Sequence, residues 1–509
     1  MCRSAPAAAV MLSAGTIAES ITTYSMRNTY GECMARLTFS KTIVLAAICS
    51  CLLATDSWRG AQAQGPTAKP DSYSWNNRPP DPQLKAEILV VVAHPDDETM
   101  VTSYLAREIY DHHKRVAVVF ENRGDGGNND VGPEQAEALG DIRETEARRG
   151  VALLGITNVW FLSGRDTASQ NVLTSLEHCG HGRCLDELVR IVRITQPSVI
   201  LTWLPDFTTG ENHADHQAAG VLATEAFDLA GDPTALPEQV SPATEPDKTG
   251  NLTEGLRPWQ PQKLYYFYNP THDDIFTGQG PQYSSSELSP SRHISYAELA
   301  AQVFTYHRTQ GGTAVADELA NHTLNTASGE IPSLVTGPAR LIMGKSLVPS
   351  GVTDDVFAGV VLDGIPYRRP PGYIAAKYAE PALEIGDPWS YYHKLWQAHG
   401  LEHLATIVPP EVSIKVGGTL AIPLVIENPL DKAIDVSLSV HAPDGWNVQP
   451  VTAQSVPPHS RYYLRILAAT PATKLPGWQQ FTVSAESANK SLGSVSLRVE
   501  LSTGWVAPQ

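Results

Sequence analysis

Basic residues are scarce in this chain relative to acidic ones. Its 509 residues include 37 Lys and Arg against 54 Asp and Glu, which gives a formal net charge of -17 at pH 7. A surface with this excess of negative charge repels nucleic-acid phosphates and anionic membranes, so neither is an expected partner. The composition is otherwise that of a globular protein, with 42% hydrophobic and 18% charged residues, and the length is sufficient for two or more domains.

Long apolar runs are also lacking. The apolar run at 42–54 has about 13 residues, whereas a membrane-spanning helix needs about 20. Two basic residues precede this run and the small-residue sequence AQA follows it at 61–63, which is the pattern of a cleaved signal peptide. We therefore expect residues 1–63 to be an N-terminal extension and signal peptide. The mature chain is then secreted or periplasmic, without a transmembrane segment; a lipid anchor through Cys51 is the alternative.

Cysteine is rare, and most of it lies in the segment that is expected to be removed. Of six cysteines, those at positions 2, 33, 49 and 51 fall before residue 64. The other two, Cys179 and Cys184, stand in the sequence EHCGHGRC. With two interleaved histidines this segment could be a metal-binding clip, but in an oxidising compartment a small disulfide loop is favoured.

From residue 86 onward, strand-like and helix-like segments alternate. Apolar, strand-like runs occur at 87–93, 115–120, 158–163, 198–204 and 263–268. Helical spacing occurs at 133–154, 184–195, 216–230 and 387–400. This alternation predicts an α/β fold with a Rossmann-like parallel sheet and helices on both faces. We assign residues 80–404 to this domain, and we expect ligands at the carboxyl ends of its strands.

The remainder of the chain has a different pattern. Residues 405–509 contain short alternating strands separated by Pro, Gly, Asn and Ser, without an intervening helical period. Such spacing predicts an all-β, immunoglobulin-like sandwich. Trp446 and Trp478 lie in it, and they either stack on sugar rings or, as is commoner, fill the core.

Two clusters of acids and histidines follow predicted strands. The first strand ends in EILVVVAHPDDETM, which contains His94, Asp96 and Asp97, and the fourth is followed by TWLPDFTTGENHADHQ, which contains His213, Asp215 and His216. Crowded carboxylates are costly unless a positive charge lies among them. The first and fourth strands are neighbours in many doubly wound sheets, so the clusters are expected to converge. Two imidazoles and one carboxylate are the ligands of a catalytic zinc site with an open water position.

These motifs resemble the PIG-L/LmbE-like family of zinc-dependent N-acetylglucosaminyl deacetylases. The resemblance rests on AHPDDE after a strand, with HADH about 120 residues later, and it extends over residues 86–310. The segments NRGDGGNN, DIRETEARR and YHRTQGG are also similar to family segments. The sequence departs from the family pattern at Ala214, where proline is frequent; this affects the stiffness of the turn and none of the reacting groups.

The resemblance implies a role for each residue of the two clusters. One zinc ion per chain would be held by His94, Asp97 and His216. Asp96 would be the general base that takes a proton from water, although an N-cap of the following helix is an alternative task for it. His213 would polarise the amide oxygen or protonate the leaving amine. Asp215 would orient one of the histidines.

Four further residues are candidates for substrate binding. They are Arg123, Asp125, Arg143 and Asp166. A surface salt bridge with Glu146 is the alternative for Arg143, and a plain turn is the alternative for Asp166. Asp125 lies in a Gly-rich loop that lets the backbone approach a sugar closely.

The expected function is that of a secreted, metal-dependent hydrolase. It would remove the acetyl group from an N-acetylglucosamine-type sugar or glycoconjugate through a zinc-activated water, with an N-acetylated amino sugar or glycan as its partner. The alternatives are an amidase acting on a different acylated amine, and a non-catalytic glycan-binding protein on the same fold. A nucleotide-binding Rossmann protein is disfavoured, because GDGG follows the second strand and pyrophosphate binding needs a Gly-rich turn after the first.

Overall fold

The computed structural model describes most of the chain after residue 79. The described residues are 80–207, 213–241, 253–268, 273–324, 335–374, 379–473 and 477–503. The expected signal peptide at 1–63 lies outside them. None of the helices in these ranges is long and apolar enough to span a bilayer.

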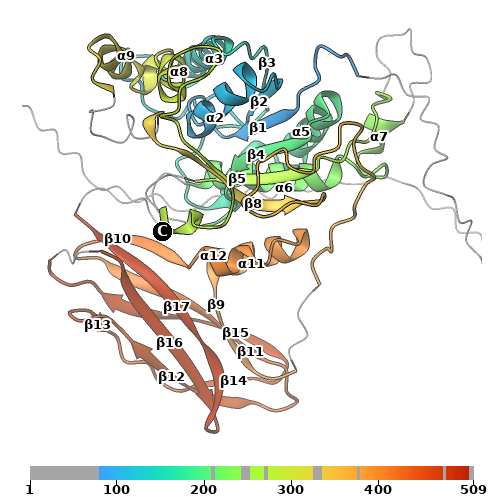
Figure 1. Ribbon diagram of the computed structural model, residues 1–509. Helices are drawn as coiled ribbons and strands as arrows, with labels where there is room; N and C mark the ends of the chain where they lie inside the picture. Colours follow the sequence, from blue (N-terminus) through green and yellow to red (C-terminus); the bar gives the residue numbers. More distant parts are fainter. Residues whose placement is uncertain are drawn as a thin grey trace, which may run out of the picture. The chain divides into compact units, whose positions relative to one another are not determined.

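The first part of the described chain is an α/β domain built on a six-stranded sheet (Figure 1). The strands are β1 (Ile88–Val92), β2 (Val116–Phe120), β3 (Asn158–Phe161), β4 (Val199–Trp203), β5 (Lys263–Phe267) and β8 (Ile342–Ser346). Their order is β3-β2-β1-β4-β5-β8, and all are parallel except β8. The five predicted strands and the predicted contact between the first and the fourth are therefore confirmed.

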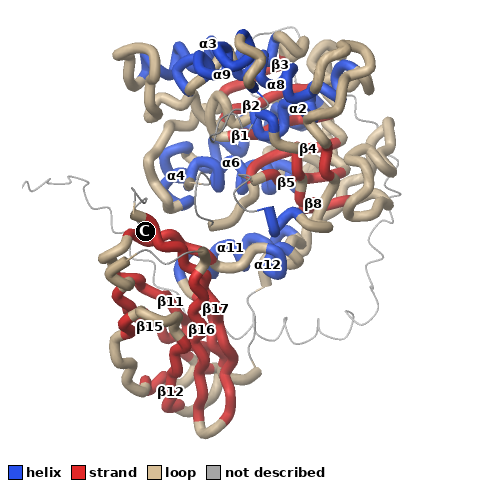
Figure 2. Tube along the Cα trace, turned by 60° about the vertical axis from the view of Figure 1, so that its left-hand side comes forward, coloured by secondary structure: helices blue, strands red, loops and turns tan. Residues whose placement is uncertain are grey.

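Helices cover both faces of this sheet, as the alternating pattern predicts (Figure 2). One face packs against α2 (Thr99–Tyr110), α3 (Glu137–Ala152) and α8 (Tyr296–Phe304). The other packs against α4 (Val172–Cys179), α5 (His181–Thr195), α6 (Ala214–Leu229) and α11 (Asp387–His399). Strand β1 shows why its sequence is a continuous apolar run. Leu89 and Val91 enter one core and Ile88, Val90 and Val92 the other, so every position is buried.

Several shorter elements complete the α/β domain. They are α7 (Pro237–Val240), α9 (Gly312–Ala320), α12 (Leu404–Ile407), the 3-10 turns η2 (Asp273–Phe276) and η3 (Arg308–Gln310), and the strand pair β6 (Gln282–Tyr283) and β7 (Ala339–Arg340).

Helix α4 ends beside the start of α5, and a disulfide joins Cys179 to Cys184 there, with both cysteines fully buried. Of the two alternatives for this cysteine pair, the structure has the disulfide.

The second part is an all-β sandwich of two sheets. One sheet contains β10 (Glu411–Lys415), β17 (Lys490–Ser502), β16 (Gln479–Ser487), β12 (Ile434–His441) and β14 (Gln454–Val456). The other contains β13 (Asn447–Val448), β15 (Ser460–Ala469), β11 (Thr419–Asn428) and β9 (Ala382–Ile385). Apolar side chains from both sheets form one core. Trp446 belongs to it, edge-on to Phe481, while Trp478 is half-buried with the Arg498 guanidinium over its ring.

The predicted domain boundary at residue 405 needs one correction. Strand β9 pairs with β11 of the sandwich in antiparallel register although it precedes that boundary. Helix α11 comes next in the chain and returns to the α/β core, where Trp396 donates a hydrogen bond to the Pro205 carbonyl at 3.1 Å. Because the chain enters the sandwich, leaves it and enters again, no single cut position separates the two folds.

Candidate active site

The two histidine-containing clusters meet at the carboxyl ends of β1 and β4. These strands are hydrogen-bonded neighbours, so the loop that follows each one leaves the same edge of the sheet. His94 Nδ1 lies 3.3 Å from His216 Nε2, and His216 Nε2 lies 3.2 Å from Asp97 Oδ1. The distance from His94 Nδ1 to Asp97 Oδ2 is 3.7 Å. The three residues predicted as metal ligands therefore present their donor atoms to one point.

This spacing fits a tetrahedral metal ion. Ligand atoms at about 2.0–2.1 Å from a zinc ion lie about 3.3 Å from one another. His216 Nε2 lies 3.3 Å from His94 Nδ1 and 3.2 Å from Asp97 Oδ1, which matches this spacing, whereas the 3.7 Å distance from His94 Nδ1 is to the other Asp97 oxygen. Two imidazole nitrogens and a carboxylate oxygen are also ligands that zinc prefers. His213 adds a third imidazole, because its nitrogen and those of His94 and His216 lie within 4.8 Å of one another.

Asp97 is held in place by four neighbouring groups. Its Oδ2 accepts hydrogen bonds from the backbone N–H of Ala93 (3.0 Å) and of His94 (2.9 Å), and from Trp203 Nε1 (3.0 Å). Its Oδ1 remains directed toward His216. Burial raises the pKa of Asp97, but the interactions with His216 and His94 outweigh burial and bring it well below its usual range. Asp97 is therefore ionised at neutral pH, as a ligand must be.

The His213, His216 and Trp203 rings lie next to one another beside this point. The centroids of His213 and His216 are 4.2 Å apart, and the Trp203 indole lies parallel to His216 at 4.1 Å. Nδ1 of each histidine is buried without a hydrogen-bond partner. Burial, together with repulsion from His216 and His94, lowers the pKa of His213 to about 2. A neutral His213 can polarise an amide oxygen through its N–H, whereas protonating the leaving amine would need the imidazolium form.

Asp96 has a strained backbone in the turn after β1. Its φ of +111° is unusual for a residue with a side chain and costs about 1–3 kcal/mol. Burial raises the pKa of Asp96 to about 6, and Asp97 adds to this while Arg143 opposes it. A carboxyl group that titrates near neutral pH is suited to exchange protons during a reaction. The alternative N-cap role is not observed, because α2 has Glu98 at its N-cap and no side-chain cap.

Asp215 is fully buried beneath His94 and saturated with hydrogen bonds. Thr167 donates to it through its backbone N–H (2.7 Å) and its hydroxyl (2.8 Å), and the Ser175 hydroxyl donates as well. Asp215 Oδ2 also lies 3.4 Å from His94 Nε2, so His94 is the histidine that it contacts. Burial lowers the pKa of His94, but hydrogen bonds to Asp166, Asp215 and Asp97 raise it well above its usual range. These carboxylates thus favour a positive charge at this position.

Asp166 and Asp125 lie on adjoining loops. Asp166 Oδ1 is 3.6 Å from His94 Nε2, and its other oxygen accepts from the Gly126 N–H at 3.0 Å. Asp125 accepts from the Asp166 backbone N–H at 3.3 Å. Together with His94 and Asp215, Asp166 forms a second group that could hold a cation. The substrate-binding roles of both residues stay predictions.

Arg143 is buried beneath the site and joins two of its loops. Its guanidinium donates to the carbonyl oxygens of Pro95 (2.7 Å) and Gly124 (3.0 Å) and to Asp96 Oδ1 (3.2 Å). The alternative of a surface salt bridge with Glu146 is therefore wrong. Gly124 has a φ of +67°, and a Cβ there would collide with the guanidinium, which explains the glycine at this position.

Arg123 forms ion pairs with α3. Its partly exposed guanidinium pairs with Asp141 and lies 3.8 Å from Glu144, both on the surface of α3. The structure thus gives Arg123 an ion pair with α3, and its substrate-binding role stays a prediction.

Trp203 and Glu121 are among the residues near the cluster that were not predicted. Trp203 donates to Asp97 and covers His216, and its position at the end of β4 was a usable signal. Glu121 follows β2, is 1% exposed, and has both carboxylate oxygens buried without a hydrogen-bond partner. Burial, together with the charge of Asp215, raises the pKa of Glu121 well above its usual range. In the sequence, Glu121 is a single acid after an apolar run, and nothing there shows that the folded protein buries its carboxylate without a partner.

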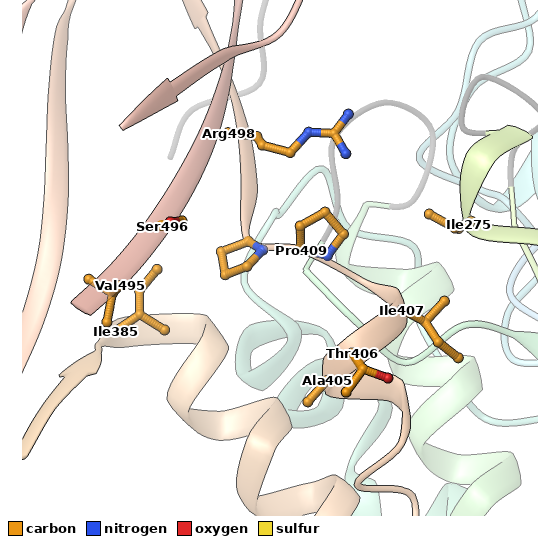
Figure 3. Close-up of a pocket in the computed structure, with 10 residues that line it drawn as sticks. Ile275, Ile385, Ala405, Thr406, Ile407, Pro409, Val495, Ser496 and Arg498 are labelled. Atoms are coloured by element: carbon orange, nitrogen blue, oxygen red, sulfur yellow. The ribbon is translucent and has the colours of Figure 1, made fainter. Parts of the chain in front are cut away.

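A separate cavity of about 490 Å³ contains none of these residues (Figure 3). Ala405, Thr406 and Ile407 of α12 line it, as do Pro409 and Arg498.

Comparisons with known proteins agree on one family. The family model described as PIG-L: GlcNAc-PI de-N-acetylase matches residues 89–227. A 1D-myo-inositol 2-acetamido-2-deoxy-alpha-D-glucopyranoside deacetylase of Frankia alni is 31% identical over 304 residues, which is 53% of this chain and 99% of the relative. A protein of the same name from Thermobifida fusca is 30% identical over 199 residues; the match covers 36% of this chain and 62% of that relative.

Among solved structures, an N,N'-diacetylchitobiose deacetylase of Pyrococcus horikoshii aligns with 51% of this chain and 84% of its own. Its TM-score is 0.35 and its sequence identity is 19%.

Proposed function

Because this chain belongs to the PIG-L (GlcNAc-PI de-N-acetylase) family, we propose that it is a zinc-dependent hydrolase. In this proposal it removes the acetyl group from an N-acetylglucosamine-type sugar or glycoconjugate outside the cytoplasm. The observation that carries the proposal is that His216 Nε2 lies 3.3 Å from His94 Nδ1 and 3.2 Å from Asp97 Oδ1, with the titratable Asp96 in the same turn as Asp97. The names of two relatives, which describe deacetylases of an acetamido sugar, support the substrate class.

The roles of the side chains follow from their surroundings. A divalent metal held by His94, Asp97 and His216 would supply Lewis acidity and bring the pKa of a water toward 7. Asp96, 24% exposed at its side chain, accepts the proton of the attacking water. The His213 N–H stabilises negative charge on the amide oxygen.

The reaction is a hydrolysis in which atoms balance. The water oxygen bonds to the acetyl carbonyl carbon, and the carbon–nitrogen bond then breaks. Asp96 returns its proton to the leaving nitrogen, so that the products are acetate and a free amine. Asp215 keeps the His94 ring oriented through its contact at 3.4 Å.

The proposed location outside the cytoplasm has separate support. The disulfide between Cys179 and Cys184 is of a kind that persists in oxidising compartments. The residues at 42–63 have the pattern of a signal peptide and its cleavage site. Expression of the full chain, followed by mass spectrometry of the exported product, tests this proposal. We expect an N-terminus near Gln64; a product that stays in the cytoplasm with residues 1–63 attached would refute it.

Acetate release tests the activity directly. The zinc-loaded mature protein is incubated with N-acetylglucosamine oligomers and conjugates, beside Asp96→Ala and His216→Ala. We expect the wild type to release acetate and both variants to lose activity. Only His216→Ala should also lose bound zinc, because Asp96 is not among the converging ligands. A stoichiometric metal with no acetate from any sugar would reject the deacetylase and favour an amidase for a different acylated amine.

A further inference from the structure

The segment YHRTQGG at 306–312 has no task in the proposed reaction, yet it lies directly behind the site. Its His307 is fully buried just before the turn η3, and Nε2 lies 2.7 Å from Glu98 Oε1. Glu98 is also fully buried. His307 Nδ1 has no hydrogen-bond partner, so the bond to Glu98 fixes the orientation of the ring.

The other oxygen of Glu98 holds the Asp96 peptide. The Asp96 backbone N–H donates to Glu98 Oε2 at 2.9 Å. Asp96 has the strained φ of +111°, and such a conformation persists only where neighbouring groups hold it. Glu98 can do so because its own carboxylate is fixed at the far side by His307. A chain of two hydrogen bonds thus runs from the 306–312 segment to the residue proposed as general base.

The same segment also contacts α3 and the loop after β2. Thr309 donates to Glu146 of α3 through its backbone N–H (3.1 Å) and its hydroxyl (2.6 Å). The Asp130 N–H donates to the Thr309 carbonyl at 3.1 Å, and Gln310 Nε2 donates to the Asn128 carbonyl at 2.7 Å. Helix α3 carries Arg143, which donates to Asp96, so the segment also contacts the helix that holds this partner of Asp96.

We propose that His307 is a positioning residue for the hydrolytic site. Acting through Glu98, it holds the Asp96 peptide in its strained conformation, so that the carboxylate is placed beside the metal ligands. The expected effect of His307 on turnover rests on the proposed function, but the hydrogen bond between His307 and Glu98 does not depend on a substrate. His307 is not a catalytic residue, because it contacts the Glu98 carboxylate and none of the converging donor atoms.

The test compares two substitutions of His307 with a control elsewhere. His307→Leu removes the donor to Glu98, whereas in His307→Gln the amide nitrogen can take the place of Nε2. The control is His399→Leu, which breaks another histidine–carboxylate pair, the 2.7 Å contact with Asp228. Asp228 lies at the C-terminal end of α6, whereas His216 lies in the first turn of that helix. Small misplacements of a reacting group cost up to about 100-fold in rate. We therefore expect His307→Leu to lose about 10- to 100-fold in kcat, with KM and bound zinc unchanged within about twofold.

Positioning and a role limited to stability predict different results. If His307 positions Asp96, we expect His307→Gln to recover most of the lost kcat, and His399→Leu to lower the melting temperature while keeping its kcat. If His307→Leu and His307→Gln lose kcat equally and in step with their melting temperatures, or if His399→Leu loses as much, positioning is refuted.

A second measurement needs no substrate. Hydrogen exchange of the Asp96 amide, followed in a short peptide that contains it, should be at least about tenfold faster in His307→Leu than in the wild type or His399→Leu. Unchanged protection of that amide refutes the proposal even if kcat falls. Should the wild type release no acetate from any sugar, the proposed function fails, and the exchange of the Asp96 amide still decides whether His307 holds this turn.

Discussion

Replacing Arg143 by Gln should move the acidic limb of the pH–rate profile to higher pH. Arg143 is 4% exposed, and its guanidinium lies 3.2 Å from Asp96 Oδ1. It is the principal influence that lowers the pKa of Asp96 against burial, and the net result is a pKa of about 6. Asp96 must be ionised to accept a proton, so activity falls as the pH falls through its pKa.

The size of the shift follows from the charge that is lost. A guanidinium in contact with a carboxylate lowers its pKa by about one to three pH units, and glutamine provides no such charge. The midpoint of the acidic limb of kcat/KM should therefore move to higher pH by about one unit or more in Arg143→Gln. This corresponds to at least about 1.4 kcal/mol of lost preference for the ionised form of Asp96. Arg143→Lys keeps the positive charge and should shift the limb less. Both variants also leave buried carbonyls of Pro95 or Gly124 without a donor, at about 1–3 kcal/mol of stability for each.

The assay is acetate release by the zinc-loaded protein between about pH 4 and pH 9. Arg148→Gln is the matched control, because Arg148 lies on the same helix and pairs with Glu144 at the surface. It removes the same charge without touching the site, and its acidic limb should stay in place. Two results would show that the Arg143 charge does not set the ionisation of Asp96. One is an acidic limb that does not move in Arg143→Gln. The other is a limb that moves as far in Arg143→Lys and Arg148→Gln as it does in Arg143→Gln.

Three further predictions concern stability and packing. Replacing Cys179 and Cys184 by Ala should lower the free energy of unfolding by about 2 kcal/mol in urea titrations, since the closed loop is short; an unchanged unfolding midpoint would contradict this. Gly124→Ala adds a Cβ against Arg143 at a positive φ, so we expect more than about 1 kcal/mol of destabilisation and reduced acetate release, and full activity at wild-type stability would be contrary evidence. Trp446→Ala should cost about 3–5 kcal/mol in calorimetry because the ring is in the sandwich core, whereas a change in sugar binding at constant stability would favour a binding role.

Much of the fold could be predicted because burial leaves a periodic signal. The run before His94 is apolar at every position, since both faces of a parallel sheet are covered. The region between the α/β domain and the sandwich was hard to interpret for a related reason. Strand β9 has only four residues and its partner β11 lies well ahead in the chain, so no local pattern assigns it to the sandwich.

The sequence by itself determined the chemical character of the site. His94, Asp96 and Asp97 follow one strand, and His213 and His216 follow another, so the ligand types could be predicted from the residues, and the resemblance to the deacetylase family implied that Asp96 is the base. The alternation of strand and helix also indicated that both groups lie at one edge of a sheet.

Only the tertiary structure decided what surrounds those residues. Arg143 is equally compatible with a surface salt bridge in sequence, but folding buries it against Asp96 and two carbonyls. Glu98 and His307 are 209 residues apart, and nothing local marks them as partners. Side-chain contacts of this kind depend on how separate loops pack together, and the period of a single strand or helix does not contain that information.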